Sequence, residues 1–254
     1  MKTTMFTSTG SLLRTLFVAL LLQAAPSFAN ETVALDRAPI NLKDQASLQR
    51  GARNFVNYCL NCHNAAYMRY SALTQIGLTE QQIKDNLMFT TDKFGDPMVS
   101  ALDPKDAKEW FGGVPPDLTL VSRVRGPDWI YTFLRGFYRD DTTPSGWNNR
   151  VFKGVAMPHV LHDLQGMQVM TKVGEQKGHG EHMEAIMKPV VDRAGTMTQA
   201  EYDHFVTDLV NYLAYMGEPA QSQRNQLGVF VLFFLVIGFF VSLWLKHEYW
   251  KDVK

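Results

Sequence analysis

The residues whose chemistry is clearest are Cys59, Cys62 and His63, which stand in the run Cys59-Leu60-Asn61-Cys62-His63. They include both cysteines of the chain, in the spacing C-x-x-C-H. Residues three and four apart share one face of a helical turn, so the two sulfurs and the imidazole point the same way. This pattern is typical of covalent haem attachment, in which the thiols add to the haem vinyl groups and the histidine presents Nε2 to the iron. The spacing therefore predicts one covalently attached haem c with His63 as proximal ligand.

Two other uses of the cysteine pair compete with haem. A bare C-x-x-C is typical of a dithiol redox centre or of half a zinc site. A structural zinc ion takes four ligands, and the chain has no further cysteine. The histidine directly after Cys62 favours haem, because a dithiol centre does not require it. A redox module that uses the thiols without haem stays open as an alternative.

A haem iron held by His63 needs either a sixth protein ligand or an open position. Met157 is the leading candidate because it lies in the small-residue run Gly154-Val155-Ala156-Met157-Pro158, whose proline can fix the approach of the loop to a flat ring. A thioether is a soft ligand that favours Fe(II) and raises the potential, as an electron carrier requires. His159 and His162 are rival ligands. If no residue fills the position, the chain is instead a haem enzyme or sensor with an open sixth site.

The N-terminus has the features of a signal peptide. Lys2 and Arg14 precede an apolar run from Leu16 to Leu22, and the small residues Ser27 and Ala29 suit a signal peptidase. We therefore expect residues 1–29 to be removed. The mature chain then has 23 basic and 25 acidic residues, a balance that gives no footprint for nucleic-acid binding.

The C-terminus carries a second apolar run, residues 227–245, which contains no charged residue. Nineteen helical residues span roughly 28 Å, close to the hydrocarbon thickness of a bilayer. We expect a transmembrane helix here, preceded by a polar linker at 221–226 and followed by a tail at 246–254. The lysines of the tail put it on the cytoplasmic side by the positive-inside rule. The protein is therefore expected to be single-pass in a bacterial inner membrane, with the domain of residues 30–220 in the periplasm.

The expected fold is mainly α-helical. Apolar spacing predicts a helix over 44–61 that leads into the haem motif, and a capping box at Thr198 and Glu201 opens another that ends near Gly217. Gly51 on the first helix would permit close approach of its mate. Residues 128–138 form the clearest helix between them, within long loop insertions where little suggests strands. The loop over 172–195 contains His179 and His182, to which we assign no role.

The chain resembles the cytochrome c1 family, the haem subunits of the cytochrome bc1 complex (ubiquinol–cytochrome c oxidoreductase), in a bacterial form. Besides the haem motif and the C-terminal helix, the resemblance is carried by Leu48-Gln49-Arg50-Gly51, Tyr67-Met68-Arg69-Tyr70, Pro115-Pro116-Asp117-Leu118, Arg123-Val124-Arg125 and Ala156-Met157-Pro158. It implies a c-type cytochrome haem domain in which Met157 is the sixth ligand and Arg125 faces a haem propionate. It also implies that the backbone of Pro115 and Pro116 lines the ring near the proximal histidine.

The resemblance further implies the partners. Cytochrome b would contact the membrane helix, a Rieske iron–sulfur protein would deliver electrons, and a soluble or membrane-bound cytochrome c would remove them. The chain would perform no bond chemistry of its own.

Overall fold

The computed structural model describes residues 33–177 and 183–252. The chain divides into two units, residues 1–34 and 35–254, and all the helices and strands described below belong to the second. The expected signal peptide, His179 and His182 lie outside the described residues. In chain order the elements are α2 (Gln45–Tyr58), β1 (Ala65–Arg69), the 3-10 helix η1 (Tyr70–Ile76), α3 (Glu80–Asn86), β2 (Pro97–Met98), α4 (Pro104–Phe111), α5 (Val121–Arg125), α6 (Pro127–Arg135), β3 (Phe137–Arg139), β4 (Trp147–Asn149), α7 (His162–Gln165), β5 (Gly166–Lys177), β6 (Met183–Ala194), α8 (Gln199–Gly217) and α9 (Gln221–Trp250).

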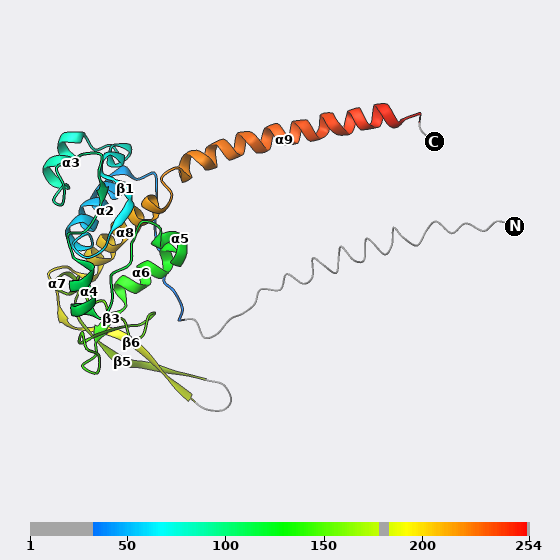
Figure 1. The fold of residues 1–254 in the computed structure, drawn as a ribbon. Coiled ribbons are helices and arrows are strands. Elements are labelled where there is room, and N and C mark those ends of the chain that lie inside the picture. The colour runs from blue at the N-terminus through cyan, green and yellow to red at the C-terminus, as the bar shows by residue number, and fades with distance from the viewer. Residues whose placement is uncertain (1–32, 178–182, 253–254) are drawn as a thin grey trace. The chain divides into compact units, whose positions relative to one another are not determined.

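The centre of the fold is the crossing of α2 and α8, which lie side by side (Figure 1). Both begin where the sequence predicts. Asp44 caps α2 by accepting a hydrogen bond from the Ser47 backbone N–H, and α8 opens with the capping box formed by Thr198 and Glu201. A Cβ atom on Gly51 would lie 2.1 Å from the Asp208 carbonyl oxygen. The predicted close approach at Gly51 is therefore confirmed.

The main core lies between these two helices and their neighbours. Its largest fully buried side chains include Phe55 of α2 and Tyr202 and Tyr212 of α8, with Leu73 and Ile76 of η1 packed into the same cluster. Burying a side chain of this size contributes roughly 1.5–3 kcal/mol relative to leaving it exposed. The cluster also reaches Cys59 and Trp129, so the core extends to the haem motif.

The helix expected over residues 128–138 is present but shorter, and the middle of the chain also contains strands. α6 ends at Arg135, and the following residues form β3, which pairs antiparallel with β4. The expectation that strands would be scarce is wrong for β5 and β6, which form a long antiparallel hairpin that Figure 1 shows as one twisted ribbon. Alternation along β5 and β6 is weak because both faces of the ribbon carry exposed apolar and charged side chains, such as Val173 and Met187.

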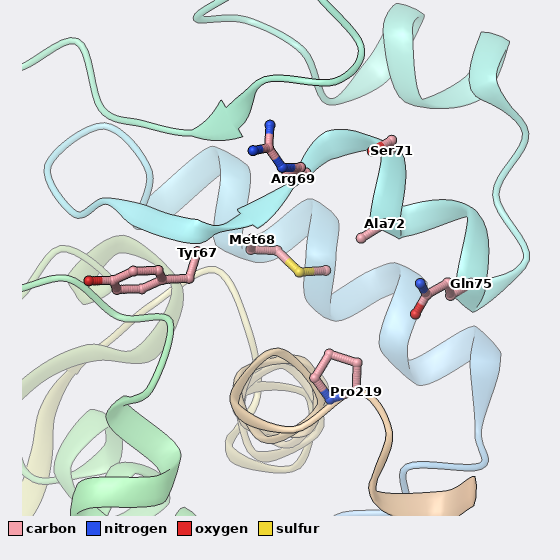
Figure 2. Close-up of a pocket in the computed structure, with 7 residues that line it drawn as sticks. All are labelled: Tyr67, Met68, Arg69, Ser71, Ala72, Gln75 and Pro219. Atoms are coloured by element: carbon pink, nitrogen blue, oxygen red, sulfur yellow. The ribbon is translucent and has the colours of Figure 1, made fainter.

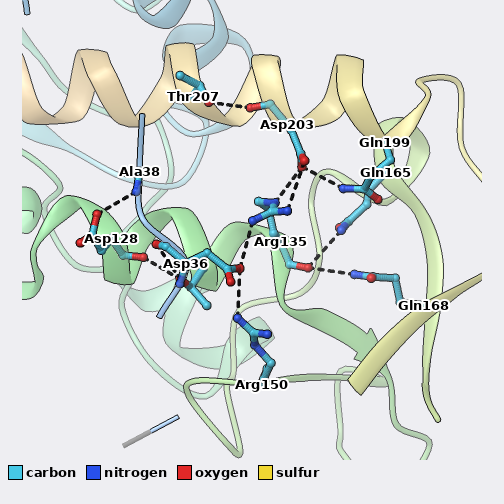
Figure 3. Close-up of polar contacts among 11 residues, drawn as sticks. Asp36, Ala38, Asp128, Arg135, Arg150, Gln165, Gln168, Gln199, Asp203 and Thr207 are labelled. Atoms are coloured by element: carbon cyan, nitrogen blue, oxygen red, sulfur yellow. Dashed lines mark hydrogen bonds and ion pairs between the residues drawn. The ribbon is translucent and has the colours of Figure 1, made fainter. Parts of the chain in front are cut away.

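An ion-pair network attaches the segment before α2 to the domain (Figure 3). Arg135 of α6 donates to Asp203 of α8 at 2.7 Å and to Asp36 at 3.0 Å, and Arg150 donates to Asp36 at 3.1 Å. Two cations and two carboxylates therefore join residue 36, α6, α8 and the segment after β4. In addition, Asp128 accepts a hydrogen bond from the Ala38 backbone N–H at 2.8 Å.

The C-terminal helix α9 is longer than the apolar run. It includes the polar residues 221–226, expected as a linker, which form its first turns. Within Gln223–Trp250, an 18-residue stretch has a mean hydropathy of 2.7, and the helix is long and apolar enough to cross a membrane. The predicted mainly helical fold with one C-terminal membrane helix is confirmed. Glu218, between α8 and α9, pairs with Arg123 of α5 and, at 2.8 Å, with Arg224 of α9.

Candidate functional site

The haem motif continues the end of α2. Cys59 is the C-cap of this helix, and its backbone N–H donates to the Phe55 carbonyl at 2.8 Å. One further turn follows, in which the N–H groups of Cys62 and His63 both donate to the Cys59 carbonyl, at 3.1 and 2.8 Å. The motif is thus a helical turn. This local geometry gives the two cysteines and the histidine the common face that the spacing predicts.

His63 is buried and is oriented by the backbone of the Pro115-Pro116 run. Its Nδ1 lies 2.8 Å from the Pro116 carbonyl oxygen, which can only accept, so the ring proton is on Nδ1. Burial lowers the pKa of His63, and the hydrogen bond to Pro116 and the nearby Asp117 carboxylate oppose that shift. Within residues 33–177 and 183–252, no hydrogen bond engages Nε2. The neutral imidazole therefore presents a free Nε2 lone pair, as a metal ligand must.

The Pro116 carbonyl is held in place by its neighbours. The Asp117 carboxylate accepts from the backbone N–H groups of Ala66 and Thr119, both at 2.8 Å. The Leu118 N–H donates to the Asn64 carbonyl at 2.8 Å. These bonds attach residues 117–119 directly to residues 64–66. Asp117 belongs to one of the motifs that carry the resemblance, but the sequence did not predict this role. Its hydrogen-bond partner Ala66 lies 51 residues away along the chain.

The environment of the two cysteines suits thiols rather than a reactive dithiol. Burial raises the pKa of the Cys59 thiol to about 12, with the neighbouring Cys62 as a second cause. Burial also raises the pKa of Cys62. Dithiol redox centres depend on a lowered pKa, which the N-terminus of a helix supplies, whereas these cysteines follow a helix C-terminus. The haem-free redox module is therefore poorly supported.

Arg125 ends α5 and lies beside aromatic rings. Its guanidinium carbon is 5.0 Å from the ring centroid of Trp129 and 6.0 Å from that of Phe152. Arg123, two residues earlier, pairs with Glu218, but in the described part of the chain Arg125 has no carboxylate within ion-pair distance. An exposed guanidinium of this kind can take a carboxylate from a bound group in bidentate fashion. Arg125 thus fits the propionate partner that the resemblance implies.

Met157 is half-buried and packs against a small second cluster formed by Phe137, Trp147 and Val155. Phe133 of α6 borders both this cluster and the main core that reaches Cys59. The Phe133 ring stacks on Trp129 at a centroid distance of 4.9 Å, in an interplanar angle of 11°. Aromatic side chains of α6 therefore connect the surroundings of the haem motif with those of Met157, a connection that the sequence did not predict.

The two rival histidines lie in different environments. His159 is 2% exposed, and its ring stacks on Phe137 at 4.8 Å with Trp147 at its edge. Burial lowers the pKa of His159 to about 4. His162 is half-exposed, stacks on Trp147 and lies 3.0 Å from the Asp163 carboxylate.

A separate shallow cavity of about 330 Å³ lies between β1, η1 and the turn at Pro219 (Figure 2). Figure 2 shows Met68 and Gln75 on the side that faces Pro219, whereas the guanidinium of Arg69 points away. Arg69 donates to the Gly95 carbonyl at 2.5 Å. None of the expected haem residues lines this cavity.

The residues present fit a haem of the c type. They supply two adjacent thiols, an imidazole with its tautomer set by Pro116, a thioether on a loop that borders an aromatic cluster, and an arginine with room for a carboxylate. Pro116 and His63 are in direct contact. For Met157 the described contacts establish the shared neighbour Phe133 rather than a contact with His63.

Comparison with known proteins identifies relatives over nearly the whole chain. The model of the Cytochrome C1 family matches residues 37–253. Cytochrome c1 from Allochromatium vinosum is 49% identical, over 86% of this chain and 89% of its own length. The ammonia monooxygenase gamma subunit of Nitrosomonas europaea is 48% identical, over 93% of this chain and 97% of its own length. Among solved structures, a chain of a hyperthermophilic respiratory Complex III superposes with a TM-score of 0.48 at 16% identity, covering 97% of this chain and 100% of that one.

Proposed function

The chain belongs to the cytochrome c1 family and is a haem-binding electron-transfer subunit of a bc1 complex, with a C-terminal membrane helix. From this we propose how its own residues hold the haem and pass electrons. Cys59 and Cys62 attach one haem c covalently, and His63 is the proximal ligand. The observation that carries this proposal is the 2.8 Å contact of His63 Nδ1 with the Pro116 carbonyl, which leaves Nε2 free. When bound, the haem iron supplies one-electron redox chemistry at a potential set by its two axial ligands.

Met157 is proposed as the sixth ligand in preference to the neighbouring histidines. A ligand atom must be reachable by an iron that sits in a flat porphyrin ring. His159 Nε2 is fully enclosed by protein, and the ring is stacked on Phe137. Met157 is only half-buried, so its sulfur can be approached without dismantling a cluster. A thioether also raises the potential relative to a second histidine, which suits a carrier that accepts electrons from a quinol chain.

The other expected residues orient the haem. Arg125 pairs with a propionate while its guanidinium lies beside the Trp129 ring, and a guanidinium keeps its charge at any ordinary pH. The Pro115 and Pro116 backbone lines the ring beside His63. Holding the proton on Nδ1 with a backbone carbonyl makes Nε2 a stronger donor, which tunes the potential downward against the raising effect of Met157.

The proposed partners follow from the family. A Rieske iron–sulfur protein delivers the electron, a soluble or membrane-bound cytochrome c removes it, and cytochrome b packs along α9. The haem domain lies in the periplasm of a bacterium, with residues 1–29 removed as a signal peptide and residues 246–254 on the cytoplasmic side of the inner membrane. The lysines after Leu245 support this orientation.

A visible spectrum of the purified protein tests the ligand assignment. We expect six-coordinate low-spin iron, no appreciable carbon monoxide binding by the reduced protein, and haem that stays on the chain in denaturing electrophoresis. Met157→Leu keeps the side-chain volume nearly constant, so the fold should persist. The reduced Met157→Leu protein should bind carbon monoxide, and its haem should have a lower potential. Met187→Leu, on an exposed ribbon residue, is the matched control. Rapid carbon monoxide binding by the unaltered protein would favour a haem enzyme or sensor instead.

Purification through an affinity tag on the full chain tests the partners, because one close relative bears the name of an ammonia monooxygenase subunit. We expect the tagged chain to retain a cytochrome b and an iron–sulfur protein from detergent-solubilised membranes, with quinol-dependent reduction of cytochrome c. Recovery of monooxygenase subunits in their place would overturn the partner assignment.

A further inference from the structure

The loop that carries Met157 is fixed at its entry. The Gly154 backbone N–H donates to Asn148 Oδ1 at 2.9 Å, and Asn148 belongs to β4. The next residue, Val155, is buried in the cluster with Phe137 and Trp147. Residues 154 and 155 are therefore anchored to the β3–β4 pair, and the loop then runs through Met157 and Pro158 to His159.

At the exit of the loop, two buried polar atoms lack an ordinary hydrogen-bond partner. His159 Nε2 and Gln165 Oε1 are fully buried and have no hydrogen bond within the described residues. His159 and Gln165 are 2% and 5% exposed. Both residues belong to one short stretch of turns, in which the His162 N–H donates to the His159 carbonyl at 3.2 Å and the Gln165 N–H donates to the Leu161 carbonyl at 3.0 Å.

The amide of Gln165 is already oriented by its other end. Gln165 Nε2 donates to the carbonyl of Arg135, the last residue of α6, at 3.1 Å, which leaves Oε1 as the acceptor of the amide. Gln168 Nε2 donates to the same Arg135 carbonyl at 3.0 Å and to the Phe137 carbonyl at 2.8 Å. The end of α6 therefore supports Gln165, and Phe137 supports the ring of His159 by stacking.

We propose that His159 is a positioning residue for the sixth ligand, with Nε2–H donated to Gln165 Oε1, so that the Met157 loop is clamped at residue 159 as it is at residue 154. The inference rests on the proposed role of Met157. A neutral histidine has one donor nitrogen and one acceptor nitrogen, and placing the proton on Nε2 satisfies both buried atoms at once. With both ends of the loop fixed, Met157 cannot withdraw its sulfur without breaking buried packing or a buried hydrogen bond.

The clamp predicts how far substitutions at residue 159 will disturb the iron. His159→Phe keeps the aromatic stack on Phe137 but removes the donor, so we expect the reduced full-length protein to bind carbon monoxide at least tenfold faster and to show a lower potential. His159→Gln restores an amide donor near the position of Nε2 and should recover most of the unaltered behaviour. His162→Phe is the matched control, because His162 also stacks on Trp147 but is half-exposed and outside the clamp.

Gln165→Leu tests the same bond from the other partner and should reproduce the effect of His159→Phe. Gln168 still donates to the Arg135 carbonyl in this variant, so the end of α6 keeps a hydrogen-bond partner. If His159→Phe does not fold, the result for Gln165→Leu decides whether the proposed hydrogen bond positions Met157.

The outcomes separate this inference from the proposed function. If Met157→Leu leaves the spectrum unchanged, Met157 is not the ligand and the ligand assignment fails. If Met157→Leu alters the spectrum and the potential, while His159→Phe and Gln165→Leu alter only the melting temperature, the clamp is merely structural and the inference is overturned.

Discussion

The orientation of His63 depends on a hydrogen bond to the backbone carbonyl of Pro116, which no side-chain substitution removes. What can be changed is the support behind that carbonyl. Asp117 accepts one backbone hydrogen bond from Ala66, in the strand after the haem motif, and one from Thr119, within its own segment. The potential of the iron should therefore respond to a residue that is not itself a ligand.

Asp117→Ala is expected to raise the potential, because a looser Pro116 carbonyl makes His63 Nε2 a weaker donor and so stabilises Fe(III) less. The loss of the two hydrogen bonds, one exposed and one partly buried, should lower the free energy of unfolding by about 1 kcal/mol. Redox titration checks the first effect, with Asp106→Ala on α4 as control. A fall in potential, the direction expected for Met157→Leu, would contradict this account of His63.

At the scale of single residues, the sequence predicts haem attachment because the motif that carries it is local and occupies five consecutive positions. The contact of His63 with Pro116 spans 53 residues, and the resemblance implied the neighbourhood without its hydrogen bond. From the sequence alone, His159 is a rival of Met157 as iron ligand. Its burial against Phe137 depends on how β3 folds back, which no local pattern encodes.

At the scale of elements, the α2–α8 crossing determines where the haem motif begins. Both helices could be predicted because their caps and apolar faces are local signals. The β5–β6 ribbon could not. Its strands carry exposed apolar residues such as Val173 and Met187 among charged neighbours, with Gln168 buried near the start of β5, so the alternation that normally indicates a strand is weak.

Gly51→Ala should weaken the crossing. The added Cβ would meet the Asp208 carbonyl oxygen at 2.1 Å and Tyr212 Cβ at 2.6 Å, and a backbone atom cannot rotate away. Overpacking of this kind costs about 1–3 kcal/mol or more, measured as a lower midpoint of denaturation. Gly95→Ala, where the new Cβ has nothing within 4 Å, is the control. Equal midpoints for the two variants would argue against the close crossing.

Tyr202 of α8 should make stability depend on alkaline pH. Its hydroxyl donates to the Leu134 carbonyl at 2.8 Å, and burial raises its pKa above the ordinary value of 10.0. The folded state therefore holds this proton more tightly than the unfolded state. The contribution is complete below pH 10.0 and is lost as pH rises through and beyond that value.

Tyr202→Phe is expected to lower the free energy of unfolding at pH 7 by about 1–3 kcal/mol, because the Leu134 carbonyl loses its donor. Above pH 10, its stability should fall less steeply than that of the unaltered protein, by up to about 1.4 kcal/mol per pH unit. Denaturation at several pH values measures both effects. Tyr67→Phe, at an 81% exposed residue, should keep the original slope. An unchanged slope in Tyr202→Phe would contradict the assignment.

At the scale of the whole molecule, the haem domain and the membrane helix should be separable. Deletion of residues 227–254 removes the apolar run but keeps the first turns of α9 and the pair between Arg224 and Glu218. We expect the shortened chain to be a haem-loaded protein in the soluble periplasmic fraction with an unchanged visible spectrum. Persistence in the membrane fraction after a carbonate wash would show that another part of the chain binds the bilayer.

The carboxylate of Glu218 has a kinetic consequence. It is paired on one side with Arg123, two residues before the proposed propionate partner, and on the other with Arg224 in the first turns of α9. With the haem bound as proposed, these two ion pairs would hold it at one height above the bilayer instead of letting it swing on a tether. Donors and acceptors confined to the same membrane search a thin layer rather than a volume, which raises the effective concentration of the pair. A haem held in this way would not travel, so the motion that closes each electron-transfer gap would have to come from its partners.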